Sequence, residues 1–221
     1  MEDPIVDNVA SPQPEDKSSP FRGSGGIGII RYGAGNIFSL TAALERLGIP
    51  YGMIFKEEDF DQYDRYIIPG VGHAGAAMNK LEQTGLIPKI KSLTKPVLGI
   101  CVGMQLLTSY SEEGDSNLLN IFPVKTLRFK DSADYKVPHT GWNQTFPEKG
   151  NPLFENIPSG SHFYFVHSYF IEFNKAYTLA STDYSTKFSA SIWKDNFYAV
   201  QIHPEKSGKY GEQLLTNFSK L

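Results

Sequence analysis

The sequence predicts an α/β fold in which a central, mostly parallel sheet is flanked by helices and extended by an added, partly antiparallel sheet. From Gly26 onward, short apolar runs alternate with amphipathic stretches, as in strands that alternate with helices over a parallel sheet. In the second half of the chain, aromatic and β-branched runs separated by turn residues replace this alternation. Such runs favour shorter, partly antiparallel strands.

The first half of the chain supplies the parallel strands. Four apolar runs predict them, over residues 27–31, 51–55, 65–68 and 96–100. Asn36 is placed to cap the first helix, and Gly48 to end it in a left-handed conformation. The inward face of this helix holds Leu40, Ala43, Leu44 and Leu47. Further helical stretches are expected between about residues 76 and 91.

The second half supplies the added strands and the last helix. Strands are expected over residues 122–129, 162–173, 177–181, 188–193 and 197–202, and a helix over 209–221. His139 lies between these runs among turn-forming residues, and Trp142 beside Gly141 is expected to be exposed. An exposed tryptophan favours contact with a partner or ligand, although a cap over a small core is an equal alternative.

Composition excludes several classes of protein. The 221 residues contain one cysteine and carry a formal net charge of −3. A chain of this length buries about 70% of its unfolded surface, so it needs no disulfide framework. The first 25 residues hold five acids and two bases, which leaves 19 of each in the remainder. A neutral domain has no basic surface for nucleic acid or an anionic membrane, so neither is expected as a partner.

The first 25 residues are set apart from the fold. They are rich in Pro, Ser, Gly and acids and lack apolar periodicity, which indicates a disordered extension or a remnant of cloning. The folded domain is therefore expected to span residues 26–221. No apolar run approaches the ~20 residues that a bilayer requires, and the acidic start is unlike a secretory signal. These features predict a cytoplasmic protein.

The strongest local motif is VLGICVGMQL, which contains the lone cysteine. Cys101 follows a buried strand, precedes a helix, and has glycines two residues away on each side, at 99 and 103. This is the G-x-C-x-G form of a nucleophile elbow, whose sharp turn requires close backbone approach. The helix N-terminus then favours the thiolate. The alternative is an inert core cysteine behind a glycine-rich strand end.

A thiol nucleophile needs a base, and the base needs an orienting acceptor. In VQIHPEKS, His203 directly follows a buried strand and Glu205 stands two residues further on in an expected extended segment. The carboxylate can then accept a hydrogen bond from the imidazole ring. The alternative is a capped turn that leads into the final helix.

A third strand end carries the glycine-rich turn PGVGHAG. Glycines at 70, 72 and 75 allow backbone N–H groups to point at one spot, which suits an oxyanion hole. Their spacing also satisfies the G-x-G-x-x-G pattern of a dinucleotide-binding turn, but it follows the third strand and not the first. We expect no cofactor. We expect no metal either, because His73, His162 and His167 lack the spacing of a zinc site.

Taken in order, these motifs resemble those of the class I glutamine amidotransferases, which have a flavodoxin-like fold. The resemblance covers nearly all of residues 26–221. Within the class, three further segments resemble the glutaminase subunits of imidazole glycerol phosphate synthases; they are YGAGN (32–36), KVPHTGWN (136–143) and FYFVHSY (163–169).

The resemblance implies a role for each site residue. Cys101 attacks the carboxamide of L-glutamine, His203 shuttles the proton, and Glu205 holds His203. The turn of Gly70, Val71 and Gly72 supplies the oxyanion hole after a peptide flip prompted by the partner. The glutamine-binding residues are Gln105, Ser168, Tyr169 and the backbone of Gly72.

The resemblance also implies a partner. Asn36, Trp142, Tyr164 and Lys206 match positions near the face where a (β/α)8 cyclase subunit docks to form a heterodimer. Ammonia then crosses this face, and the cyclase makes imidazole glycerol phosphate in histidine biosynthesis. The isolated chain is expected to have very low activity.

Departures from the family pattern leave other functions open. Arg31 stands where many relatives have Asp, and Ile202 replaces a common Phe. Neither touches the proposed triad, so they bear on the pathway more than on the reaction. Alternatives are a paralogous subunit that feeds another synthase, such as one modifying surface sugars, and a catalytically silent binding module. A γ-glutamyl or cysteine peptidase on a related fold is a further alternative.

Overall fold

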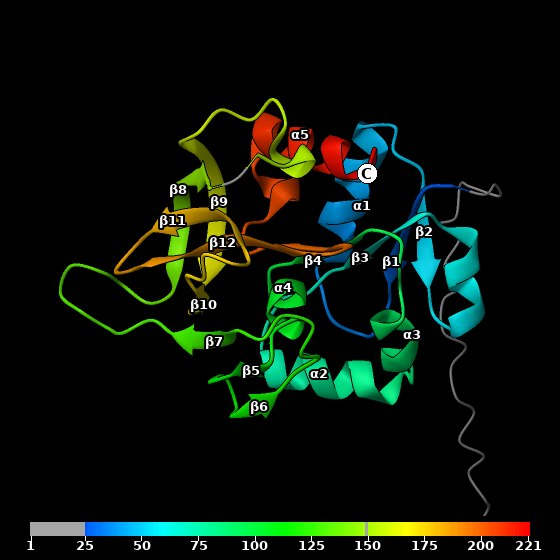
Figure 1. Cartoon of the computed structure of the whole chain (residues 1–221), viewed down its shortest axis with the longest axis horizontal. Coiled ribbons are helices and arrows are strands. Elements are labelled where there is room, and N and C mark those ends of the chain that lie inside the picture. The colour runs from blue at the N-terminus through cyan, green and yellow to red at the C-terminus, as the bar shows by residue number, and fades with distance from the viewer. Residues whose placement is uncertain (1–24, 149) are drawn as a thin grey trace, which may run out of the picture.

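The computed structural model describes residues 25–148 and 150–221, which fold around one mixed sheet (Figure 1). Its parallel part has the strand order β2-β1-β3-β4-β13. These strands are β1 (Ile27–Ile30), β2 (Tyr51–Ile54), β3 (Arg65–Ile68), β4 (Val97–Ile100) and β13 (Phe197–Val200). The predicted α/β class with a mostly parallel sheet is confirmed. The predicted extension lies, except for Gly25, outside the described residues.

Helices cover both faces of the parallel strands. Figure 1 shows α1 and α5 on one face and α2, α3 and α4 on the other. Their bounds are α1 (Ile37–Arg46), α2 (Ala74–Gln83), α3 (Ile87–Lys91), α4 (Val102–Leu106) and α5 (Gly208–Phe218). Every residue of β1 and β4 is buried, because both faces of these strands lie under helices. This burial explains why the strands appear in the sequence as unbroken apolar runs.

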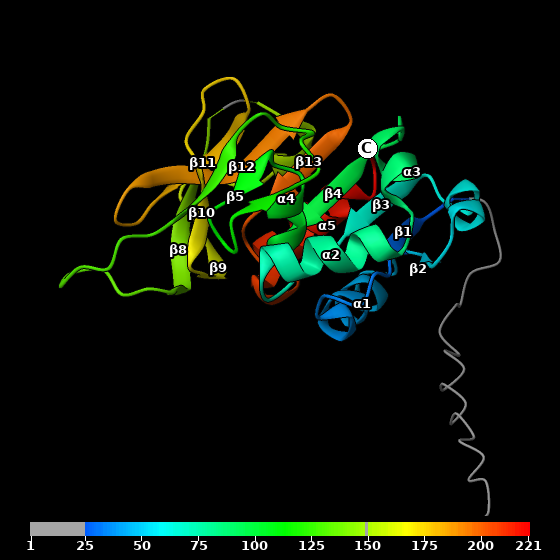
Figure 2. The ribbon, with the colours of Figure 1, turned by 90° about the horizontal axis from the view of Figure 1, so that it is seen from below.

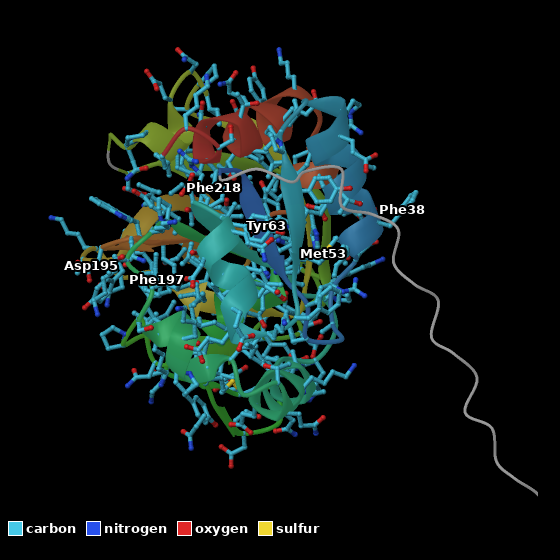
Figure 3. The ribbon with its side chains drawn as sticks, turned by 90° about the vertical axis from the view of Figure 1, so that its right-hand side faces the viewer. Phe38, Met53, Tyr63, Asp195, Phe197 and Phe218 are labelled. Atoms are coloured by element: carbon cyan, nitrogen blue, oxygen red, sulfur yellow. The ribbon has the colours of Figure 1, made fainter. Side chains whose placement is uncertain are left out.

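The first helix follows the sequence prediction in part. Leu40, Ala43 and Leu44 face the core, and Gly48 after the helix has a φ of +63°. Asn36 stands at the N-cap position, but its side chain makes no capping bond and Nδ2 instead donates to Oγ of Ser39. Phe38 projects from the first turn into solvent with 82% of its surface exposed (Figure 3).

Strands that pair mostly antiparallel extend the sheet beyond β13, the exception being the parallel pair of β5 and β7. Figure 2 shows them gathered at one end of the molecule and the strands β1–β4 at the other. The path continues through β12, β10, β7, β5 and β6, while β11, β8 and β9 form a branch from β12. Their bounds are β5 (Tyr110–Ser111), β6 (Ser116–Asn117), β7 (Lys125–Arg128), β8 (His139–Pro147), β9 (Ser161–His167), β10 (Tyr169–Glu172), β11 (Thr178–Asp183) and β12 (Lys187–Lys194).

Two expectations for the second half were wrong. The single strand expected over 162–173 is two strands, β9 and β10, interrupted at Ser168. The segment around His139 is a nine-residue strand and not a turn, because β8 pairs with β9 from His139–His167 to Thr145–Ser161. Trp142 is exposed as expected, at 56% of its surface, because alternate residues of β8 face solvent.

Candidate active site

The carboxyl ends of β3, β4 and β13 lie side by side and carry the three predicted motifs. β4 pairs in parallel with β3 on one side and with β13 on the other. The chain therefore delivers the glycine-rich turn, Cys101 and the segment before His203 to one edge of the sheet. Ligands of open α/β sheets bind at this edge.

The chain turns sharply at Cys101. Its φ of +54° and ψ of −111° lie in a region that residues with a side chain rarely adopt. A Cβ added at Gly103 would lie 1.8 Å from the carbonyl oxygen of Ile68, and one at Gly99 would lie 2.6 Å from that of Gly103. Both glycines are therefore required, because the backbone at Gly103 packs directly against β3 and the backbone at Gly99 packs against the first turn of α4.

His203 and Glu205 form a buried pair. Nδ1 of His203 lies 2.8 Å from Oε1 of Glu205, and the side chains are only 3% and 4% exposed. The two residues are joined by the 3-10 turn Pro204–Lys206, so the extended segment expected from the sequence was wrong, although the two side chains meet. The backbone of His203 is also fixed, since its N–H donates to the carbonyl of Tyr164 and its carbonyl accepts from Oγ of Ser207.

The charge of His203 is controlled by its two neighbours. Burial alone would lower the pKa of His203, but hydrogen bonds to Cys101 and Glu205, together with the charges of those residues, raise the pKa to about 10. Its Nε2 atom is buried and has no partner other than the side chain of Cys101 among the described residues. His203 is therefore an imidazolium near neutral pH, next to the sulfur of Cys101.

The glycine-rich turn has a fixed stem and an open tip. The hydroxyl of Tyr32 donates to the carbonyl of Pro69 at 2.5 Å, and the N–H of Val102 donates to the carbonyl of Gly70 at 3.3 Å. Burial, and then the charge of Cys101, raise the pKa of Tyr32, so the hydroxyl remains a donor. Gly72 at the tip has a φ of +88°, and a Cβ there would meet no atom within 4 Å.

A pocket of about 450 Å³ opens over Cys101. Among its lining residues are Cys101, His203, the turn tip and the predicted glutamine-binding residues Gln105, Ser168 and Tyr169. Nε2 of Gln105 donates to the carbonyl of Tyr169 at 3.3 Å, whereas the buried Oε1 has no partner in the described part of the chain. A residue of the pocket lining thus carries a buried acceptor without a hydrogen-bond partner among the described residues.

Two residues at or beside the pocket escaped the sequence analysis. Gln201 is fully buried, and its Nε2 atom lies 3.7 Å from Sγ of Cys101. Its signal is a glutamine that directly follows the apolar end of β13. Glu113 brings a carboxylate to the lining and accepts from the N–H of Ala74 at 2.6 Å. No local pattern indicated Glu113, because it reaches the pocket through a loop that packs on the start of α2.

The four residues expected at a partner face lie around the mouth of this pocket. Asn36 and Lys206 line it, and Nζ of Lys206 lies 5.8 Å from the ring centroid of Tyr164. The rings of Tyr164 and Trp142 meet edge to face at 6.2 Å. Lys206, Tyr164 and Trp142 therefore form one row that starts at the pocket lining, to which Asn36 also belongs.

The fold, the elbow and the His203–Glu205 pair together define a class of enzyme. The family model for class-I glutamine amidotransferases matches residues 29–220, and the chain belongs to this family. Among curated relatives, two bacterial proteins are each named imidazole glycerol phosphate synthase subunit HisH. The one from Bacteroides thetaiotaomicron is 47% identical over 196 residues, which cover 88% of this chain and 99% of the relative. The one from Haemophilus influenzae is 47% identical over 192 residues, covering 87% and 96%.

Solved structures agree in fold. A putative GMP synthase protein from Thermoplasma acidophilum superposes with a TM-score of 0.68 at 20% identity, covering 90% of this chain and 94% of that one. The PurLQS structure from Thermotoga maritima gives a TM-score of 0.67 at 16% identity, covering 89% and 98%. Within the described residues, no helix is long and apolar enough to cross a membrane.

Proposed function

We propose that this chain is the glutaminase subunit of an imidazole glycerol phosphate synthase in histidine biosynthesis. It hydrolyses glutamine to glutamate and ammonia and passes the ammonia to a (β/α)8 cyclase subunit. The observation that carries the chemistry is the convergence of Cys101, His203 and Glu205 at one edge of the sheet. The 47% identity to the two HisH subunits supports the pathway.

The first half-reaction forms a thioester. The thiolate of Cys101 attacks the carboxamide carbon of glutamine, and the carbonyl oxygen becomes an oxyanion. The tetrahedral intermediate collapses as Nε2–H of His203 gives its proton to the leaving nitrogen, which departs as ammonia. Glu205 keeps the ring oriented through Nδ1 and balances the charge of the imidazolium while it carries that proton.

The second half-reaction restores the thiolate. Neutral His203 takes a proton from water as the oxygen attacks the γ-glutamyl thioester, and the C–S bond breaks. Glutamate leaves, His203 is again an imidazolium, and the net reaction consumes one glutamine and one water. Gln201 donates to the sulfur at 3.7 Å, which favours the anionic form that begins each cycle.

The oxyanion hole is completed by the partner. We assign it to the N–H groups of Val102 and of the Val71–Gly72 tip. The N–H of Val102 is engaged by the carbonyl of Gly70 in the isolated chain, so a peptide must turn before that N–H can meet an oxyanion. The tip can turn because Gly72 has open space around it. Hydrolysis then waits until a cyclase is present to receive the ammonia.

Asn36, Trp142, Tyr164 and Lys206 are the proposed contacts with the cyclase, and Glu113 the proposed partner of the glutamine ammonium group. Glutamate release by the isolated chain, and by the chain with its cyclase and the nucleotide substrate, tests the proposal. We expect release only in the assembly, and none from a Cys101→Ala assembly. Vigorous hydrolysis by the isolated chain, or release by Cys101→Ala, would refute it.

A further inference from the structure

Two buried histidines outside the proposed triad lie in direct contact. Nδ1 of His139 and Nε2 of His167 are 3.0 Å apart, and the residues are 4% and 6% exposed. They face each other across the β8–β9 pair. The ring of His139 is stacked between those of Phe165 and Tyr184, at centroid distances of 4.9 Å and 4.1 Å. The pair is thus held in place by the strands and by aromatic packing.

The hydrogen bonds of this pair have one possible direction. Nδ1 of His167 lies 2.7 Å from the carbonyl oxygen of Tyr169, which can only accept, so Nδ1 carries the proton. In a neutral ring Nε2 of His167 is then bare and accepts from Nδ1–H of His139. Nε2 of His139 is bare in turn, and it accepts from Nδ2 of Asn143 at 3.3 Å.

The orientation of Asn143 is fixed independently. Its Oδ1 accepts from the N–H of Gln144 at 2.8 Å, and its Nδ2 donates to the carbonyl of Asp183 at 2.9 Å. Desolvation by burial lowers the pKa of His139 to about 4 and that of His167 to about 3, so both rings are neutral near pH 7. A directed chain therefore runs from Asn143 through both histidines to the carbonyl of Tyr169.

The chain ends on the wall of the glutamine pocket. The same carbonyl of Tyr169 accepts a hydrogen bond from Nε2 of Gln105. The NH₂ group of the Gln105 amide, and not its oxygen, must therefore face this carbonyl. The second N–H of that group points to Oε1 of Gln201 at 3.2 Å, and Gln201 contacts Cys101. Oε1 of Gln105 is thereby left as a buried acceptor without a partner among the described residues.

We propose that His139 and His167 are positioning residues for glutamine binding: through the Tyr169 carbonyl they fix the Gln105 amide with Oε1 toward an N–H group of the substrate. This inference rests on the proposed function, because it assumes that glutamine occupies this pocket. The histidines leave the triad itself untouched. Their loss therefore acts on the binding of glutamine more than on the chemical step.

The protonation pattern is tested by ¹⁵N NMR of the histidine rings in the full chain. We expect both His139 and His167 as Nδ1–H tautomers, the less stable form of free imidazole. Asn143→Asp replaces the donor with a carboxylate that only accepts, so His139 should switch to Nε2–H. A wild-type His139 protonated at Nε2, or an unchanged tautomer in Asn143→Asp, would overturn the proposal.

Kinetics of the assembled enzyme test the role. His139→Phe keeps the aromatic stacking but removes both hydrogen bonds of the ring. Loss of about one net hydrogen bond should raise KM for glutamine about five- to tenfold, with kcat changed by less than about twofold. Asn143→Asp should also raise KM for glutamine. Because Asn143 is only half-buried, this variant keeps the test informative if His139→Phe folds poorly.

His162→Phe is the matched control, because His162 lies on the exposed face of the same strand as His167. It should leave KM unchanged. The positioning role would be overturned if KM for glutamine were unchanged in folded His139→Phe and Asn143→Asp. It would also be overturned if His162→Phe raised KM by the same factor. Failure of the proposed function would be a separate outcome. In that case Cys101→Ala would still release glutamate, while His139 and His167 would still be Nδ1–H tautomers.

Discussion

The Nδ1 atom of His203 lies 2.8 Å from Oε1 of Glu205, and both side chains are almost completely buried. The short turn between them brings the carboxylate behind the ring, so that Nε2 remains directed toward Cys101. A buried imidazolium needs such a carboxylate, because isolated charges are costly to remove from water. The pair thus gives His203 both its orientation and its charge.

Replacing the carboxylate tests this arrangement. Glu205→Gln keeps the size of the side chain and an acceptor oxygen but removes the charge that stabilises the imidazolium. We expect kcat for glutamate release in the assembly to fall about 10²- to 10⁴-fold, with KM little changed. Steady-state kinetics of the variant with its cyclase measure this, and activity within twofold of wild type would contradict the role given to Glu205.

The same pair predicts how stability depends on pH. Because the folded-state pKa of His203 is raised from 6.5 to about 10, its stabilising contribution is complete below about pH 6.5. The contribution is lost as pH rises through about 10. Wild type should therefore have a larger free energy of unfolding than Glu205→Gln, and this difference should shrink as pH rises from about 6.5 to about 10. Denaturant unfolding of both proteins across this pH range measures the difference. A difference that grows with pH would show that His203 is not protonated in the native state.

A pair of glycine variants separates strain from catalysis. Gly72 and Gly48 both have positive φ angles, +88° and +63°, and a Cβ at either would meet no atom within 4 Å. Each change to Ala should cost about 1–2 kcal/mol of stability. Only Gly72→Ala should lower kcat, by about 10²- to 10³-fold, because only that turn is proposed to supply oxyanion donors. Equal kcat values for the two folded variants would argue against the turn as the oxyanion hole.

The two tryptophans provide a matched test of the partner face. Trp142 is 56% exposed beside the pocket mouth, whereas Trp193 is 36% exposed and paired with Tyr198 near the amino end of β13. We expect Trp142→Ala to raise the dissociation constant for the cyclase about 30-fold, as for a contact of about 2 kcal/mol. Trp193→Ala should leave it unchanged. Calorimetric titration measures both, and the reverse ranking would place the interface elsewhere.

Local features of the fold and site were predictable from sequence. The glycines around Cys101 indicated the elbow because a side chain at Gly103 would strike β3 and one at Gly99 would strike α4, and this constraint is visible within a few residues. The strand of His139 was not predictable, since its turn-forming neighbours Pro138 and Gly141 outweigh a pairing with β9 that spans distant segments. Glu113 was missed for the same reason, because its place in the pocket depends on contacts with the start of α2.

Labelling of the lone cysteine tests the central claim most directly. Cys101 is the only thiol of the chain, so a glutamine-like chloroketone can modify one site. In the assembly with the cyclase, intact-mass analysis should show one label per chain and loss of glutaminase activity. Excess glutamine should protect against both, and Cys101→Ser should take up none. An unlabelled Cys101 in a fully inactivated enzyme, or persistent glutamate release by Cys101→Ser, would contradict the account.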